Sequence, residues 1–319
     1  MPPTGDTMTK DNDFISQNLF EASITLKAYG GVKRDPKEAK RIQEAHGATR
    51  SVGHFDVYLI GKEALAEIKQ IDGEIRNRHY ALTLPWSDTS RVIPIAQFEK
   101  WAGEMRDFKT RRHAAVVKFV NNWPQLIEQA KQELNGKFNA TNYPPANEVA
   151  DKFIFEVDYF AVRRGQHLQG SRLGNLFAKE LETRCTAIED AAKQKVVNAF
   201  AELKTRITDK LEHFSDRMHT YGDAPNPEYG KKPRAKETIK VGVFRASTIE
   251  GLRDLVDVAK GLNFYDDPVI NEVLAGIKKN LTGTGSAQAY SDKLKEDDGL
   301  RAQVAQKTDA LLDKMSAFE

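Results

Sequence analysis

The feature that most constrains this fold is segment 181–218, which contains neither glycine nor proline and carries a regular apolar stripe. Its apolar residues recur at steps of three or four, the spacing of one face of an α-helix. They are Leu181, Cys185, Ile188, Ala192, Val196, Ala199, Leu203, Ile207, Leu211, Phe214 and Met218. Such steps repeat as an eleven-residue unit of about 3.67 residues per turn, so helices of this kind pack side by side with little supercoiling. The segment predicts one long amphipathic helix.

A second segment, 98–134, follows the same rhythm, with Arg112 as the one charged interruption of its stripe. Its apolar members are Phe98, Trp101, Met105, Phe108, Val116, Phe119, Trp123, Ile127, Ala130 and Leu134. At about 1.5 Å per residue each helix would extend on the order of 50 to 60 Å. Neither helix could shield its apolar stripe from water without a packing partner. We therefore predict that the two segments pair as a long antiparallel helical hairpin.

Three shorter segments show the alternation of a half-buried β-strand. They lie at 20–28, which ends at two glycines, at 153–161, and at 239–243. Before the hairpin, residues 57–75 have helical periodicity. We predict that the strands form a small three-stranded sheet, with the first strand and the 57–75 helix in one N-terminal region.

The C-terminal helices have clear start signals. Ser247 followed by Glu250 has the spacing of a capping box, and Asp267 before Pro268 has the pattern of an N-cap with proline at the first helical position. A loop at 282–286 precedes a last amphipathic helix that reaches Phe318. These signals predict that the chain ends in packed helices.

The predicted fold class is therefore mainly α with a small β-sheet (α+β). It combines a long antiparallel helical hairpin, a three-stranded sheet and C-terminal helices. We divide the chain into a disordered tail (1–13), an N-terminal strand and helix region (14–92), the hairpin with its intervening strand (93–220), a basic linker rich in proline and glycine (221–240), and a C-terminal strand and helices that pack back on the sheet (241–319).

Composition excludes several classes of protein. The 48 basic and 46 acidic side chains nearly cancel, so the chain lacks the overall positive field typical of nucleic-acid and membrane-surface proteins. Cys185 is the one cysteine, which rules out an intrachain disulfide and favours a reducing compartment. No stretch approaches the roughly 20 apolar residues of a membrane span. We predict a cytoplasmic protein with no membrane partner.

Patterns that carry chemistry are absent or weak. Residues 283–286 lack the lysine that ends a phosphate loop, and His213 and His219 lie six residues apart, which is not the spacing of metal ligands on one helical face. Cys185 lies on the apolar stripe and is predicted to be a core residue. We therefore predict no catalytic, cofactor-binding or metal-binding residues and lean against an enzyme. A site assembled from distant residues stays open, and a deep polar pocket with converging ionisable groups would support it.

Two basic clusters are candidates for nucleic-acid contact, because lysine and arginine neutralise phosphates. One is Lys109, Arg111 and Arg112 on the first long helix, and the other is Lys231, Lys232, Arg234 and Lys236 in the linker. The alternative is that each cluster is a solvated face balanced by acids such as Glu104 and Asp107.

Several short motifs between residues 81 and 318 carry a family resemblance. They are Leu84-Pro85-Trp86, Asn142-Tyr143-Pro144-Pro145-Ala146, 153–162, Leu262-Asn263, Asp266-Asp267-Pro268, Leu300-Arg301 and Asp313-Lys314-Met315-Ser316. With these motifs the chain resembles an uncharacterised family of phages and prophages that is defined only as a domain of unknown function. The resemblance implies a bacterial host cell and an accessory role beside AAA+ ATPases of the MoxR or cobaltochelatase type and von Willebrand A-type proteins.

Two functions follow as hypotheses. The first is a phage-encoded accessory or scaffold protein that acts through protein–protein interaction or self-association, with an AAA+ ATPase as a possible partner. The alternative is a nucleic-acid-binding protein of phage DNA metabolism.

Overall fold

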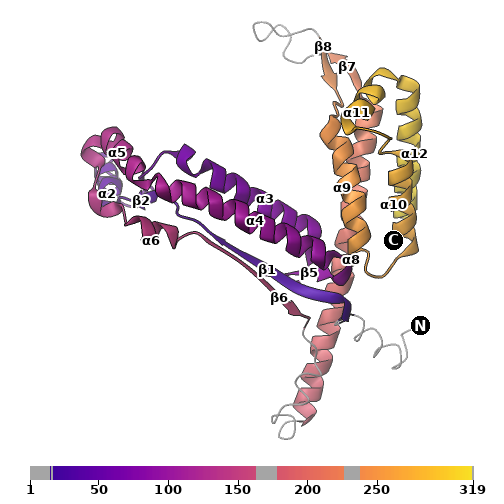
Figure 1. The fold of residues 1–319 in the computed structure, drawn as a ribbon, viewed down its shortest axis with the longest axis horizontal. Coiled ribbons are helices and arrows are strands. Elements are labelled where there is room, and N and C mark those ends of the chain that lie inside the picture. Colours follow the sequence, from indigo (N-terminus) through magenta and orange to yellow (C-terminus); the bar gives the residue numbers. More distant parts are fainter. Residues whose placement is uncertain (1–14, 16, 163–177, 226–237, 318–319) are drawn as a thin grey trace. The chain divides into compact units, whose positions relative to one another are not determined.

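The computed structural model describes residues 15, 17–162, 178–225 and 238–317 (Figure 1). The predicted fold class is confirmed, because helices dominate and the β-structure is a small antiparallel sheet of short strands. The chain forms two compact units. Unit 1 contains the described residues of 1–22, 81–99 and 159–319, and unit 2 contains residues 23–80 and 100–158.

Unit 2 is built on the antiparallel helices α3 (Ala66–Leu82) and α4 (Ile95–Asn121), which run side by side in Figure 1. A ladder of ion pairs joins them, in which the residue numbers increase along α3 as they decrease along α4. The pairs are Lys118–Glu67, Arg112–Asp72, Arg111–Glu74 and Arg78–Glu104. Unit 2 thus contains a helical hairpin, and its two arms are α3 and α4 instead of the predicted segments 98–134 and 181–218. Ile68, Ile71 and Ile75 give α3 a buried apolar face. The second predicted arm, 181–218, belongs to unit 1.

The predicted helix 98–134 is two helices. After α4 the chain bends at Asn122, and α5 (Trp123–Leu134) begins with Pro124 in its first turn. Proline has no backbone N–H to donate and its ring clashes with the preceding turn, so it ends one helix and starts the next. Trp123 is buried here, and its indole donates a hydrogen bond to the carbonyl of Pro144 at 3.0 Å.

Short elements complete unit 2 around α5. They are β2 (Val32–Arg34), α2 (Pro36–Ala45), β3 (Asp56–Tyr58), η1 (Lys62–Leu65), η2 (Asn135–Lys137), η3 (Ala140–Asn142) and α6 (Ala146–Ala150). Strands β2 and β3 pair as an antiparallel ribbon. The aromatic rings of Tyr29, Phe119 and Tyr143 surround Trp123, which fixes this end of the unit.

The main sheet has four strands in the order β4 (Leu84–Pro85), β5 (Arg91–Pro94), β1 (Leu19–Lys27) and β6 (Ile154–Ala161). The first two predicted strands correspond to β1 and β6. The third does not join them. Residues 238–241 form β8 (Thr238–Val241), which pairs with β7 (Gly222–Pro225) in a separate two-stranded ribbon. The prediction failed because alternation identifies a strand but does not identify its neighbour.

Helix α8 (Ala178–Thr220) is the spine of unit 1, as the eleven-residue rhythm predicted. It packs against α12 (Asp298–Ser316) and α9 (Ala246–Leu262), while α10 (Pro268–Asn280) contacts α9 and α12, and α11 (Ala287–Glu296) contacts the same two helices. Gly276 allows α10 close to α12, because a Cβ at this position would lie 2.6 Å from a methyl carbon of Leu311. None of the helices in the described ranges combines the length and the apolar composition that crossing a membrane requires.

Candidate functional site

The basic cluster on α4 is largely used inside unit 2. Arg112 is buried, with 4% of its side chain exposed, and its Nε donates to Asp72 Oδ1 at 2.6 Å. A second guanidinium nitrogen donates to the carbonyl oxygen of Lys27 at 2.7 Å. Arg111 is paired with Glu74 at 2.9 Å, whereas Lys109 is exposed. Arg112 was therefore wrongly counted as a phosphate contact, since its charge is enclosed and already neutralised.

The second basic cluster, Lys231, Lys232, Arg234 and Lys236, lies outside the described residues. Along the chain it falls in the connection between β7 and β8.

The two histidines near the end of α8 have separate surroundings. His219 Nε2 lies 2.8 Å from Asp309 Oδ2, and the hydroxyl of Ser215 donates to Asp309 Oδ1 at 2.5 Å. The hydrogen bond from Ser215, followed by the contact with His219, holds the pKa of the Asp309 carboxyl below its usual value. These contacts tie α8 to α12. Within the described residues, no three His, Cys, Asp or Glu side chains are grouped to hold a metal ion.

An open groove of about 600 Å³ lies between α8 and α9. Its floor is apolar, and its floor residues are Leu203, Leu255, Val258, Ala259 and Leu262. Gly251 of α9 also lines it, and a Cβ at this position would meet only the Lys210 ammonium, at 3.8 Å. Charges of both signs form the rim, with Asp209 and Lys210 on α8 and Asp254 on α9. We call this feature the apolar groove.

Aromatic residues extend the apolar groove at one end. Phe200 lies one turn before Leu203 on α8, and its ring centroid is 5.7 Å from that of Tyr265, which follows the C-terminal end of α9. Tyr265 is 47% exposed. Val197, which precedes Phe200 by about one turn of α8, is 59% exposed. The groove and these aromatic residues together form what we call the α8–α9 face.

A second hollow of about 460 Å³ adjoins the other end of the groove. On α8 it is lined by Lys210, His213 and Arg217, which share one helical face because they are spaced three and four residues apart. Arg245 lines the opposite side. Lys210 and His213 line the apolar groove as well. We call this second feature the cationic hollow.

Local backbone geometry places Arg245 at the cationic hollow. Gly242 has φ +61°, and a Cβ there would lie 2.6 Å from the backbone nitrogen of Tyr221, so the chain turns tightly against the end of α8. Phe244 is fully buried and packs on the Tyr221 ring at 5.2 Å between centroids. Arg217 donates a hydrogen bond to the carbonyl oxygen of Val243. The turn thus holds the start of α9 beside α8.

The predicted capping box at Ser247 and Glu250 is absent. Helix α9 starts two residues earlier than that motif requires, with Arg245 as the N-cap, and the backbone N–H of Arg245 donates to Thr248 Oγ1 at 3.3 Å. The first turn of α9 contains no acidic residue. Since a helix N-terminus carries a partial positive charge, Arg245 adds a like charge where an acid is usually found.

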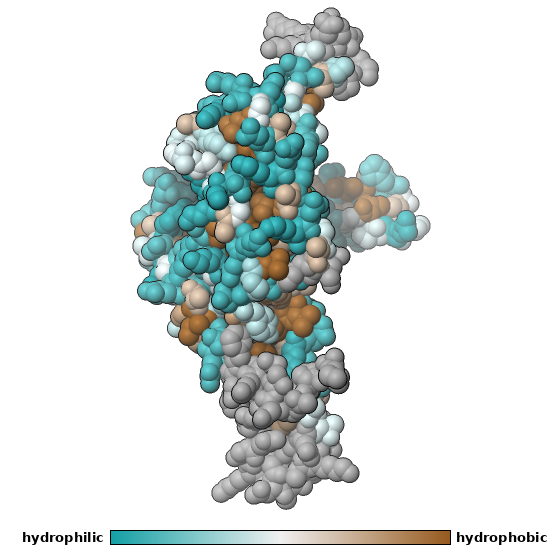
Figure 2. Space-filling view, turned by 90° about the vertical axis from the view of Figure 1, so that its right-hand side faces the viewer, coloured by the Kyte–Doolittle hydropathy of each residue, from teal (hydrophilic) through white to brown (hydrophobic). Residues whose placement is uncertain are grey.

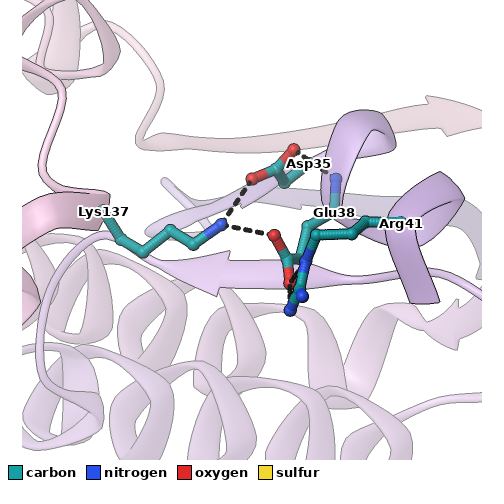
Figure 3. A network of polar contacts seen from close by, with 4 residues as sticks. All are labelled: Asp35, Glu38, Arg41 and Lys137. Atoms are coloured by element: carbon teal, nitrogen blue, oxygen red, sulfur yellow. Dashed lines mark hydrogen bonds and ion pairs between the residues drawn. The ribbon is translucent and has the colours of Figure 1, made fainter. Parts of the chain in front are cut away.

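The start of α2, unlike that of α9, contains acidic residues (Figure 3). Asp35 caps the helix by accepting from the N–H of Glu38 at 3.0 Å. Lys137 lies between both carboxylates, 2.7 Å from Glu38 and 3.6 Å from Asp35. Hydrogen bonds from Arg41, then from Lys137, lower the pKa of Glu38 to about 2. Acids and cations here neutralise one another.

The cationic hollow was missed from the sequence because its cations are dispersed over positions 210 to 245 and belong to different elements. The available signals were weak. They were the spacing of Lys210, His213 and Arg217, and an arginine directly before a helix whose first turn lacks an acid.

Hydrophobic surface on the face drawn in Figure 2 occurs as small patches between hydrophilic residues. Comparisons with protein-family models, curated proteins and solved structures found no match to this chain.

Proposed function

We propose that this chain is a phage-encoded accessory protein, a scaffold or adaptor in the cytoplasm of a bacterial host cell, that binds an amphipathic helix of a partner protein on the α8–α9 face. The observation that carries the proposal is the apolar groove, an open channel between two helices with a floor of aliphatic side chains and a charged rim. Partner helices commonly lay their apolar face into a groove of this kind.

The aromatic end of the face supports the same function. Tyrosine and phenylalanine are enriched in the cores of protein interfaces, and Phe200 and Tyr265 lie where the groove ends. The rim charges of Asp209, Lys210 and Asp254 would orient the bound helix, because complementary charges fix register more than they add affinity.

The family resemblance supplies the partner class. It associates such chains with AAA+ ATPases of the MoxR type, so we propose an ATPase of that type as the protein that carries the amphipathic helix. Self-association through the same face is the alternative that the test below separates.

Light scattering coupled to size exclusion tests this proposal with the full chain and a MoxR-type ATPase from the same genome. Gly251→Leu fills the apolar groove without displacing core atoms, because its nearest neighbour is the flexible tip of Lys210. Replacing a helical glycine also favours the helix by up to about 1 kcal/mol. The control is Gly73→Leu in α3, where a Cβ would have no neighbour within 4 Å.

We expect the native chain and Gly73→Leu to co-elute with the ATPase and Gly251→Leu to elute separately. Absence of the complex with the native chain, or a complex that Gly251→Leu leaves intact, would reject the proposal. A native oligomer that Gly251→Leu alone dissociates would assign the face to self-association instead.

A nucleic-acid-binding function is the second candidate. The observation that favours it is that the connection holding Lys231, Lys232, Arg234 and Lys236 begins and ends on the ribbon directly before Arg245. Mobility shifts with single- and double-stranded DNA at two salt concentrations test it. Binding through phosphates should weaken steeply with salt, with a slope of about 0.7 to 0.9 per phosphate contacted. Lys231→Gln/Lys232→Gln should reduce that slope.

A further inference from the structure

We propose that the cationic hollow is a binding site for a terminal phosphate group, as carried by a small phosphomonoester. Its walls hold Lys210, Arg217 and Arg245, together with the hydroxyls of Ser247 and Thr248. These groups come from α8, from the turn after β8 and from the first turn of α9, so folding brings them together around one space.

The hollow itself has no carboxylate among its described lining residues to balance its cations. Among the described residues, none that line the hollow is acidic, and Lys210, Arg217 and Arg245 have no carboxylate partner there. By contrast, the four cations of the α3–α4 ladder each meet a carboxylate. Like charges held close together repel, and a bound dianion would remove that repulsion.

The start of α9 adds to the positive potential. The partial charge of a helix N-terminus is equivalent to about half an elementary charge, and helix N-termini bind phosphate through backbone N–H groups. Arg217 donates one N–H to the carbonyl of Val243, which fixes the direction of its guanidinium beside that helix start. An anchored guanidinium with remaining N–H donors suits an oxyanion, because arginine can donate two parallel hydrogen bonds to phosphate.

Size and composition define the ligand class. A volume of about 460 Å³ falls in the range of small-molecule sites. Phe214 of α8 and Leu252 of α9 add apolar atoms to the lining, so the hollow suits a ligand that joins a doubly charged phosphate to a small organic body.

Isothermal calorimetry of the full chain with glycerol 3-phosphate tests the site, with glycerol as the uncharged control probe. The test variant is Lys210→Gln/Arg245→Gln, which removes two exposed cations and leaves the Arg217–Val243 contact in place. The matched control is Lys260→Gln, an exposed lysine near the other end of α9. We expect saturable binding of glycerol 3-phosphate only, and at least about a tenfold loss of affinity in the double variant, since hydrogen bonds to charged groups are the strong ones.

No saturable heat up to about 10 mM ligand, ten times a millimolar Kd, would overturn the proposal. Equal affinity of the double variant and Lys260→Gln would overturn it too. A second titration with a short DNA strand, with and without a 5′-phosphate, separates a terminal phosphate from backbone phosphodiesters. Equal binding of both strands together with no response to glycerol 3-phosphate would assign the hollow to nucleic-acid backbone and reject the monoester. These titrations contain no partner protein, so their outcome is independent of the adaptor function.

Discussion

The helix pairs α3–α4 and α8–α9 use charged side chains in opposite ways. Between α3 and α4, each cation of the ladder pairs with a carboxylate of the other helix, and one of these pairs, Arg112 with Asp72, is buried. Between α8 and α9 the helices leave an apolar groove and a hollow in which Lys210, Arg217 and Arg245 lack a carboxylate partner among the described residues.

The comparison teaches that a run of cations in the sequence does not locate a binding surface. Arg111 and Arg112 are adjacent in sequence but serve the folding of unit 2. In the hollow, Arg245 is far in sequence from Lys210 and Arg217 of α8, and the turn at Gly242 brings it beside them. We therefore expect substitutions in the ladder to change stability and substitutions on the α8–α9 face to change binding.

The largest effect on stability is expected for Arg112→Ala. It leaves the buried carboxylate of Asp72 without its partner, and breaking a buried ion pair from one side costs about 3 to 5 kcal/mol. Urea denaturation measures the loss. Arg111→Ala, whose side chain is 53% exposed in its pair with Glu74, is the control and should lose much less. Equal losses would show that the buried pair is not the structural centre of the ladder.

Arg245→Asp should separate stability from binding. Aspartate at the N-cap accepts hydrogen bonds from the first turn and complements the helix dipole, so we expect a gain of about 1 to 2 kcal/mol. The same change places a negative charge in the cationic hollow and should abolish binding of glycerol 3-phosphate. Arg245→Gln distinguishes capping from loss of charge. It should weaken binding of glycerol 3-phosphate, but it should not give the full gain in the free energy of unfolding. A destabilised Arg245→Asp would refute the idea that this helix start carries excess positive charge.

Ser215→Ala should cost about 1 kcal/mol at neutral pH, because it removes a hydrogen bond to the carboxylate that joins α8 to α12. This bond is the main cause of the lowered pKa of Asp309. A carboxyl with a lowered pKa contributes stability above its ordinary value of 3.8 and loses that contribution as the pH falls. The difference in the free energy of unfolding between the variant and the native chain should therefore become smaller in acid. Thr205→Ala, whose hydroxyl bonds only within α8, is the matched control.

The smallest effect is expected at the start of α2. Lys137→Gln removes one exposed cation from the Glu38 network, so its melting temperature should fall only slightly at pH 7. Because the pKa of Glu38 is lowered to about 2, the contribution of Glu38 is present above its ordinary value of 4.5 and is lost as the pH falls towards 2. The melting temperatures of the variant and the native chain should converge over that pH interval. A difference that persists unchanged in acid would mean that Lys137 acts through other contacts.

Much of the fold follows from periodicity in the sequence. The eleven-residue rhythm predicts α8, and alternation predicts β1 and β6. Partners were harder to predict, since the apolar stripe of one helix fits several others. The break at Asn122 was missed although Pro124 signals it, because the apolar rhythm continues through the proline.

The candidate site could not be read from the sequence in the same way. Lys210 and Arg217 look like ordinary charges on the polar edge of an amphipathic helix, and nothing local to Arg245 indicates that it faces them. Their proximity depends on long-range packing, on Gly242 at positive φ and on the burial of Phe244.

The most direct test of the account is hydrogen exchange of the full chain with and without saturating glycerol 3-phosphate, read by mass spectrometry along the chain. We predict slower exchange in peptides that contain residues 243–250 at the start of α9, and no change across residues 66–121 of the α3–α4 ladder. Protection in residues 105–118, or no protection at the start of α9, would contradict the claim that binding belongs to the α8–α9 region and structural charge pairing to α3 and α4.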